Sequence, residues 1–203
     1  MPMKLYGFWR SLATYRVRAA LALKGIEVEQ ISINLLQGKQ HAEDYKAINP
    51  QSVVPALLID GGPPLFQSMA ILEYLEETHP KPALLPKDPR GRARVRGLAQ
   101  IAVSDGHPLV VPRIRGYLER EMHQDEPARN KWLAHWTLEA LKALEGHLGK
   151  ESETGRFCHG DAHFRRMHEN RRFRPFPTAQ TARREPDPLN GGSYNDIHPQ
   201  AVH

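Results

Sequence analysis

Short runs of alternating hydrophobic and polar residues open the chain, with one helical stretch between the first two. Residues 3–8 and 27–34 alternate with a period of about two, which predicts two strands. Between them, residues 14–24 place Val17 and other apolar side chains on one side, and Gly25 stands where a helix commonly ends. A strand, a helix and a second strand in this order predict a βαβ unit with parallel strands.

A second group of elements is predicted after residue 55. Residues 56–59 and 64–66 read as a hairpin, because Asp60 and the Gly61-Gly62 pair suit a tight turn. Residues 67–78 then predict an amphipathic helix. Its inward-facing side chains would be Ala70, Ile71, Tyr74 and Leu75. The order βαβ and then ββα is that of a thioredoxin-like domain.

Two helical stretches follow, and prolines interrupt the first. Residues 91–122 have a helical pattern, but Pro108 and Pro112 each remove an N–H donor and kink or break the helix. Residues 126–148 carry apolar residues at three- to four-residue spacing, which predicts a helix packed against the preceding one. The side chains that would make this contact are Leu133, Trp136, Ala140, Leu141 and Leu144.

Composition changes at two places and divides the chain. The proline-rich stretch 81–90 puts a domain boundary near residue 83, which separates an α/β domain at 1–83 from an all-α domain at 88–162. Residues 163–203 contain no lysine, are rich in arginine and proline, and follow neither period. We interpret this segment as a frameshifted or replaced C-terminus rather than a functional tail, and we expect it to pack poorly.

Charge and composition narrow the class of function. Residues 163–203 hold seven arginines against four acidic residues, so +3 of the net charge of +5 lies there. The rest is nearly balanced and has no basic stripe with stacking aromatic residues, so we expect no nucleic-acid partner. The single cysteine, Cys158, excludes an internal disulfide and fits a reducing compartment. The 11 histidines show no metal-binding spacing, and no apolar run suits a membrane span, so we predict a cytoplasmic protein without a metal.

Two predicted helix starts carry the polar residues that suggest chemistry. Arg10 and Ser11 stand where the first strand leads into a helix, and Gln67 and Ser68 begin the helix after the hairpin. The first N–H groups of a helix lack partners, and the helix dipole favours negative charge there. With Pro55 in a turn between them, these starts predict a site for a small, negatively charged, peptide-like ligand.

These segments resemble the zeta-class glutathione transferases, the family of maleylacetoacetate isomerase and the bacterial maleylpyruvate isomerases. In that family the first helix begins S-S-C-S-W-R-V-R or S-S-A-A-Y-R-V-R. The corresponding residues here are Ser11-Leu12-Ala13-Thr14-Tyr15-Arg16-Val17-Arg18. The similarity extends through the segments 49–57, 66–75, 84–86, 104–109 and 155–162, about four fifths of the chain. It implies a thioredoxin-like domain followed by a helical domain, and a homodimer.

The resemblance implies glutathione as the cofactor and Ser11 as the residue beside its sulfur. A free thiol has a pKa of about 8.5, so a glutathione enzyme must stabilise the reactive thiolate. Ser11 matches the serine assigned to that task, with Leu12 beside it, while an N-cap is its ordinary structural role. The family's second serine and its cysteine are Leu12 and Ala13 here, and Thr14 offers a substitute hydroxyl.

The remaining contacts to glutathione also follow from the resemblance. A cis Val54-Pro55 bond would present the N–H and C=O groups of Val54 to the peptide. Gln67 and Ser68 would bind the γ-glutamyl end of glutathione, whose carboxylate suits a helix start. Gln40 matches a further glutamine that contacts glutathione, and a solvated loop residue is the alternative interpretation of that position.

Arginines are the candidates for the substrate. Maleylacetoacetate and maleylpyruvate are dianionic, and arginine binds carboxylates in a bidentate manner. Arg10 matches an arginine of both isomerase groups, and we assign it to catalysis and to the substrate. Arg113 is a second substrate candidate and His107 a cofactor candidate, although a histidine at a helix kink is more often structural. We interpret Arg16 as structural.

The implied reaction is cis–trans isomerisation of a maleyl compound in the catabolism of tyrosine and other aromatic compounds. Thiolate addition to the cis double bond leaves a single bond that can rotate, and expulsion of glutathione then yields the trans product. Two alternatives stay open. One is a general glutathione transferase that conjugates electrophiles, and the other is a non-catalytic glutathione-binding protein with a damaged substrate domain.

Overall fold

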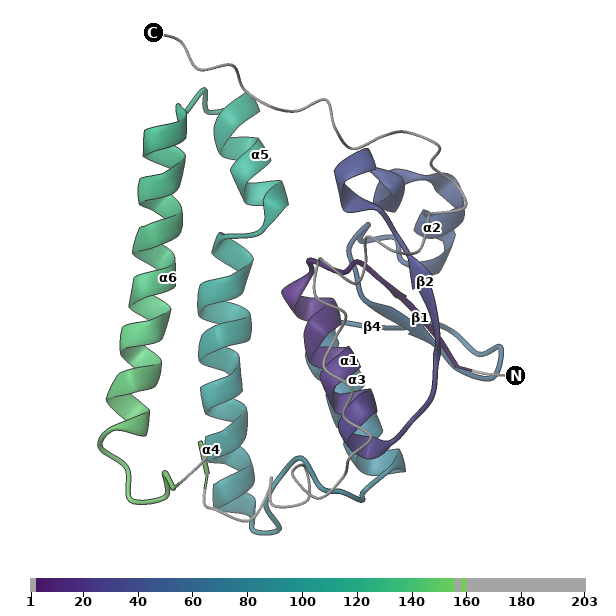
Figure 1. Ribbon diagram of the computed structural model, residues 1–203, viewed down its shortest axis with the longest axis vertical. Helices are drawn as coiled ribbons and strands as arrows, with labels where there is room; N and C mark the ends of the chain where they lie inside the picture. Colours follow the sequence, from purple (N-terminus) through teal and green to yellow (C-terminus); the bar gives the residue numbers. More distant parts are fainter. Residues whose placement is uncertain (1–2, 156–157, 160–203) are drawn as a thin grey trace, which may run out of the picture. The chain divides into compact units, whose positions relative to one another are not determined.

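The computed structural model describes residues 3–155 and 158–159, which belong to one structural unit (Figure 1). Our expectations for residues 163–203 lie outside the described residues. The last few positions of the predicted helical domain, 160–162, lie outside them as well.

A mixed four-stranded sheet forms the N-terminal part of this unit, in the order β2-β1-β3-β4. Its strands are β1 (Lys4–Gly7), β2 (Glu29–Ser32), β3 (Ala56–Leu58) and β4 (Leu65–Phe66). β1 runs parallel to β2 and antiparallel to β3, which pairs antiparallel with β4. The predicted βαβ unit and hairpin are confirmed, and with them the thioredoxin-like arrangement.

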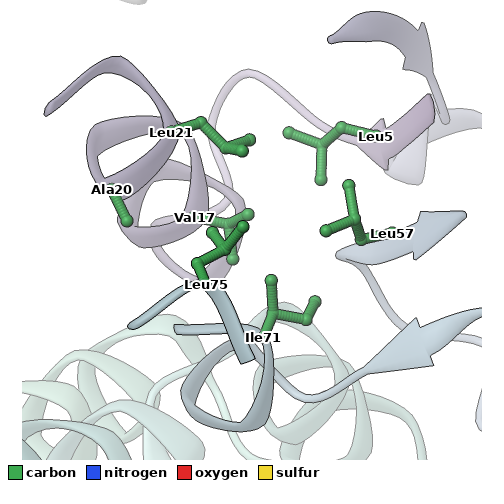
Figure 2. Packing of buried hydrophobic residues seen from close by; sticks show 7 residues of the cluster. All are labelled: Leu5, Val17, Ala20, Leu21, Leu57, Ile71 and Leu75. Carbon is green, nitrogen blue, oxygen red and sulfur yellow. The ribbon is translucent and has the colours of Figure 1, made fainter. Parts of the chain in front are cut away.

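Helices α1 (Leu12–Lys24) and α3 (Ser68–Thr78) lie side by side and bury one face of the sheet (Figures 1 and 2). α1 begins two residues earlier than the periodicity indicates because Ser11 caps it, and it ends at Gly25, whose φ of 67° suits glycine. Figure 2 shows side chains of both helices directed toward Leu5 and Leu57 of the strands. Each completely buried aliphatic side chain contributes about 1.5–3 kcal/mol of hydrophobic free energy.

The predicted inner face of α3 is only partly right. Ile71 and Leu75 are completely buried and Tyr74 is half-buried, whereas Ala70 is exposed. Periodicity indicates which residues share a face of a helix, but it does not show how far the neighbouring elements extend over that face. Ala70 lies beyond the covered part.

Helix α2 (Glu43–Ile48) was not predicted from the pattern. It has six residues and follows two 3-10 turns, η1 (Leu35–Gln37) and η2 (Lys39–His41). A helix this short shows less than two turns of periodicity, so its stability comes from packing. Tyr45 anchors the helix: its side chain packs against Phe8 and Val54, and only 2% of its surface is exposed.

A buried ion pair ties the end of α1 to α3 and to the chain that follows α3. Lys24 Nζ donates to Glu76 Oε2 at 2.8 Å and to the carbonyl oxygens of His79 and Pro82. The N–H groups of Leu84 and Leu85 donate to the Glu76 carboxylate. Both charges are therefore fully hydrogen-bonded, which makes their burial tolerable.

The second part of the unit is helical, as expected. It contains α4 (Pro89–Gln100), the π turn η3 (Ile101–Gly106), the 3-10 turn η4 (His107–Leu109), α5 (Pro112–Arg120) and α6 (Glu126–Leu148). The predicted helix over 91–122 is thus broken next to its two prolines, because each proline lacks the N–H donor that a continuous helix needs. No helix among the described residues has the length and apolar character that crossing a membrane requires.

Close contact between α6 and the η3–η4 segment confirms most of the predicted packing. A Cβ on Gly106 would stand 2.7 Å from the Cβ of Ala140, and Trp132 donates its indole N–H to the Leu109 carbonyl. The other predicted contacts, Leu133, Trp136 and Leu144, are half-buried. Leu141 is 54% exposed, so its assignment to this interface was wrong. It lies at the edge of the helical face that the neighbouring segment covers.

Candidate functional site

The start of α1 presents one hydroxyl with two uses. Ser11 is the N-cap, and its Oγ accepts a hydrogen bond from the Thr14 N–H at 3.2 Å. That bond occupies a lone pair of the oxygen and leaves the hydroxyl hydrogen to donate elsewhere. The N–H groups of Leu12 and Ala13, in the first turn, have no carbonyl partner within the helix. Capping and stabilisation of an anion are therefore compatible at Ser11.

Thr14 does not serve as the substitute donor that the sequence suggested. Its side chain is buried, with 3% of its surface exposed, and its Oγ1 accepts a bond from the Phe8 N–H at 3.3 Å. A Cβ on Gly7 would stand 2.4 Å from the Thr14 methyl group, so the threonine fills the space that this glycine leaves. Thr14 holds the loop between β1 and α1 in place.

Side-chain hydrogen bonds from Tyr45 and Asn49 hold the turn between Asn49 and β3 in place. Val54–Pro55 is cis, as the resemblance implied. The carbonyl of the preceding Val53 accepts two bonds, from the Tyr45 hydroxyl at 2.7 Å and from the Asn49 side chain at 2.8 Å. Burial raises the pKa of Tyr45 to about 12, so this hydroxyl remains a donor at neutral pH. Val54 itself precedes β3 and takes no part in the described strand pairing.

The start of α3 combines a strained backbone with a buried hydroxyl. Gln67, the residue before the helix, has φ 65° and ψ 115°, a conformation that costs a non-glycine residue roughly 1–3 kcal/mol. Its exposed side chain donates to Gln51 Oε1 at 2.9 Å, which joins the α3 start to the proline turn. Ser68 is 4% exposed, and the Arg16 guanidinium of α1 donates to its Oγ.

The remaining candidates differ in their surroundings. Gln40 has a buried Oε1 without a hydrogen-bond partner among the described residues, which fits a ligand contact better than a solvated loop residue.

Arg10 is exposed, and its guanidinium carbon stands 5.5 Å from the centre of the Trp9 ring, within the range of a cation–π interaction.

His107 lies within electrostatic range of two arginines. Burial and then the charges of Arg16 and Arg113 lower its pKa below the ordinary value, which favours the neutral imidazole at pH 7. The structure thus brings together residues of α1, η4 and α5 that the sequence could only place separately. Arg113 itself is exposed.

No group of histidine, cysteine, aspartate and glutamate residues suited to a metal occurs in the part of the chain that the structure describes. The site is instead built from hydroxyl groups, helix starts and arginines, which is a chemistry for binding anions.

Comparisons with known proteins agree with this geometry. Residues 1–77 match the family model for the N-terminal domain of glutathione S-transferases. Maleylacetoacetate isomerase of Pseudomonas aeruginosa is 45% identical over 161 residues, which cover 78% of this chain and 74% of that protein. Maleylpyruvate isomerase of a Ralstonia species is 45% identical over 159 residues, with the same shares covered. The chain belongs to this isomerase family of zeta-class glutathione transferases.

Solved structures of the family have the same fold. A maleylacetoacetate isomerase of Methylobacterium extorquens AM1 with bound malonate and glutathione has a TM-score of 0.77 and 51% identity, and the match covers 78% of this chain and 74% of that one. The holo structure of a zeta-class maleylpyruvate isomerase has a TM-score of 0.75 and 44% identity over the same shares.

Sequence reasoning missed the residues that hold the candidate site residues in position through hydrogen bonds. Arg16, Gln51 and Tyr45 contact the proposed cofactor-binding residues or the turn that carries them. Arg16 was recognised as part of the helix motif but was assigned to the fold alone. Its partner Ser68 is 52 residues away, and no local pattern indicates a contact over that separation.

Proposed function

We propose that this protein catalyses the glutathione-dependent cis–trans isomerisation of a maleyl compound, either maleylacetoacetate or maleylpyruvate. The observation that carries the proposal is the conjunction of two anion-accepting helix starts, at Ser11 and Ser68, with the proline turn that Tyr45 and Asn49 hold through the Val53 carbonyl. Membership of the isomerase family supports the choice of reaction.

Glutathione fits the residues that surround this turn. Ser68 and Gln67 at the start of α3 would bind its γ-glutamyl end, and the backbone of Val54 would pair with the cysteinyl residue. The orphaned buried oxygen of Gln40 would accept a bond from the cofactor. His107, neutral at pH 7, is a further contact. Relatives crystallised with glutathione support this assignment.

Ser11 would lower the energy of the cofactor's sulfur anion. When bound, glutathione supplies the thiolate that adds to the double bond and leaves after rotation. The Ser11 hydroxyl, whose oxygen accepts from the Thr14 N–H, and the Leu12 N–H, which lacks a partner within the helix, would donate to the sulfur at the end of α1 where negative charge is favourable. Their contribution is a lower thiol pKa and therefore a larger fraction of the reactive species at neutral pH.

Arginines would hold the dianionic substrate. Arg10 lies between Trp9, over whose ring its guanidinium stands, and the cap residue Ser11, so it would bind a substrate carboxylate beside the thiolate. Arg113 adds positive charge from the start of α5. The relative that binds malonate, a dicarboxylate, together with glutathione supports a site for a dianion next to the cofactor.

The setting that we propose follows the family: a cytoplasmic homodimer that acts in the catabolism of tyrosine and other aromatic compounds. The chain has a mass of 23.1 kDa, so sedimentation of a dimer would give about twice this value. We expect neither a membrane nor a nucleic acid as a partner.

One assay separates the proposed reaction from its alternatives. Maleylpyruvate and maleylacetoacetate, each in large excess over glutathione, are incubated separately with the protein and followed by proton NMR of the vinyl hydrogens. An isomerase converts all substrate and leaves free glutathione unchanged, because the cofactor is returned in each cycle. A conjugating transferase stops when glutathione is consumed. Absence of turnover with both maleyl substrates, together with retained glutathione binding, would instead identify a non-catalytic binding protein.

A further inference from the structure

Arg16 has a hydroxyl as its hydrogen-bond partner where a carboxylate would be expected. Its Nε and Nη2 donate to Ser68 Oγ at 3.3 and 3.2 Å. Arg16 lines a cavity together with two acidic residues, and both of these have other partners. Glu73 pairs with Arg96, and Glu76 pairs with Lys24. Among residues 3–155 and 158–159, no carboxylate forms an ion pair with Arg16. A half-buried cation without a counter-ion is costly unless a ligand supplies the negative charge.

The two bonds also determine what the Ser68 hydroxyl can do. A serine hydroxyl normally rotates and can donate or accept. Here both N–H groups of the guanidinium edge occupy the lone-pair side of the oxygen, so the hydroxyl hydrogen is left to donate away from α1. Ser68 is 4% exposed and opens α3, whose first N–H groups and dipole favour an anion at the same end.

We infer that Arg16 is a positioning residue for the cofactor: it orients the Ser68 hydroxyl toward the α-carboxylate of the γ-glutamyl group and supplies the counter-charge for it. The inference rests on the proposed function. It reassigns Arg16, which the helix motif alone marks as structural, to recognition of one chemical group of glutathione.

The test compares two peptides that differ only in this carboxylate. Isothermal titration measures binding of glutathione and of 4-aminobutyryl-cysteinyl-glycine, which lacks the carboxylate, to the full chain. Arg16→Ala should weaken glutathione roughly 10- to 100-fold, the usual loss of a hydrogen bond to a charged group, and leave the analogue within about twofold. Arg18→Ala removes the same charge from the same helix and should change glutathione binding by less than about threefold.

A double-mutant cycle shows whether Arg16 acts through Ser68. The loss caused by Arg16→Ala should shrink several-fold when Ser68→Ala is already present, because the oriented hydroxyl is then absent. If circular dichroism shows that Arg16→Ala does not fold, Arg16→Lys takes its place and should show the same preference between the two peptides with a smaller loss.

Equal losses for both peptides, or strictly additive effects in the cycle, would overturn the inference and return Arg16 to a structural role. Failure of the wild-type protein to bind glutathione is a different outcome. It would overturn the proposed function itself, and the inference with it.

Discussion

At the scale of the residue, Ser11 combines the cap of α1 with the chemical role that we propose for the same side chain. Its oxygen caps α1 through the Thr14 N–H, while its hydrogen stays available for a thiolate. Capping and the proposed catalysis would therefore use different atoms, and substitutions can separate them. Glycine is tolerated at an N-cap far better than alanine is, but it offers no hydroxyl.

We predict that Ser11→Ala and Ser11→Gly both lower the isomerisation rate by about 10²–10³-fold, the usual loss for one donor to a developing anion. Their stabilities should differ. Alanine should lower the free energy of unfolding by about 1 kcal/mol and glycine by only a few tenths. Steady-state rates and urea denaturation measure the two effects. A near-wild-type rate in Ser11→Gly would transfer the role to backbone N–H groups.

Arg10 is predicted to distinguish substrates by charge. Arg10→Ala should reduce kcat/KM for a maleyl dianion at least about 10-fold more than for a neutral chloro-nitroarene conjugated by the same protein, because an arginine–carboxylate contact is lost. Arg115→Ala, which removes an exposed arginine of α5, serves as the control and should affect neither substrate strongly. Similar losses for both substrate classes would assign Arg10 to the cofactor or the fold.

At the scale of the element, the buried Lys24–Glu76 pair links α1 to α3. Donors and acceptors from α1, α3 and residues 79–85 meet there, with the Lys24 side chain completely buried. Removal of one partner leaves the other charge without compensation, which costs more than the pair contributes. A second contact between the same two helices, from the Arg16 guanidinium to Ser68 Oγ, lies at the start of α3.

Glu76→Ala should therefore lower the free energy of unfolding by about 3–5 kcal/mol. Glu77→Ala, at the exposed neighbouring position, should change it by no more than about 0.5 kcal/mol. Chemical denaturation followed by tryptophan fluorescence measures both values. A loss below about 1 kcal/mol in Glu76→Ala would show that the pair is dispensable for the packing of α1 on α3.

At the scale of the whole molecule, the candidate site joins α1, the proline turn and α3, so one ligand would cross-link elements that are distant in the sequence. Glutathione at about 100 times its dissociation constant should stabilise the native state by about 2.7 kcal/mol. For a chain of this size that corresponds to a rise in Tm of roughly 5–10 °C.

Differential scanning calorimetry with and without glutathione checks this rise. The dipeptide cysteinyl-glycine at equal concentration is the control, because it cannot reach the start of α3, and it should raise Tm by much less. An equal rise with both ligands would place the binding energy at the cysteinyl end and argue against a contribution from Ser68.

The sequence by itself determined the secondary structure that is long enough to show a period and the residues that begin it. The strands, α1, α3 and α6 follow from hydrophobic spacing, and the breaks near Pro108 and Pro112 follow from missing N–H donors. The resemblance of residues 11–18 also indicates the right family, because the motif at the start of α1 is contiguous in the chain. These features are local: residues within a short window of sequence are sufficient to produce each of them.

Only the tertiary structure decided how far each face is covered and which polar groups meet. Ala70 and Leu141 lie on the apolar faces of their helices yet are exposed, because burial depends on the neighbours and not on spacing. Likewise, Arg16 and Ser68 become partners only when α1 and α3 pack together on the sheet. A contact across 52 residues of chain is a product of packing, and packing is a property of the whole fold.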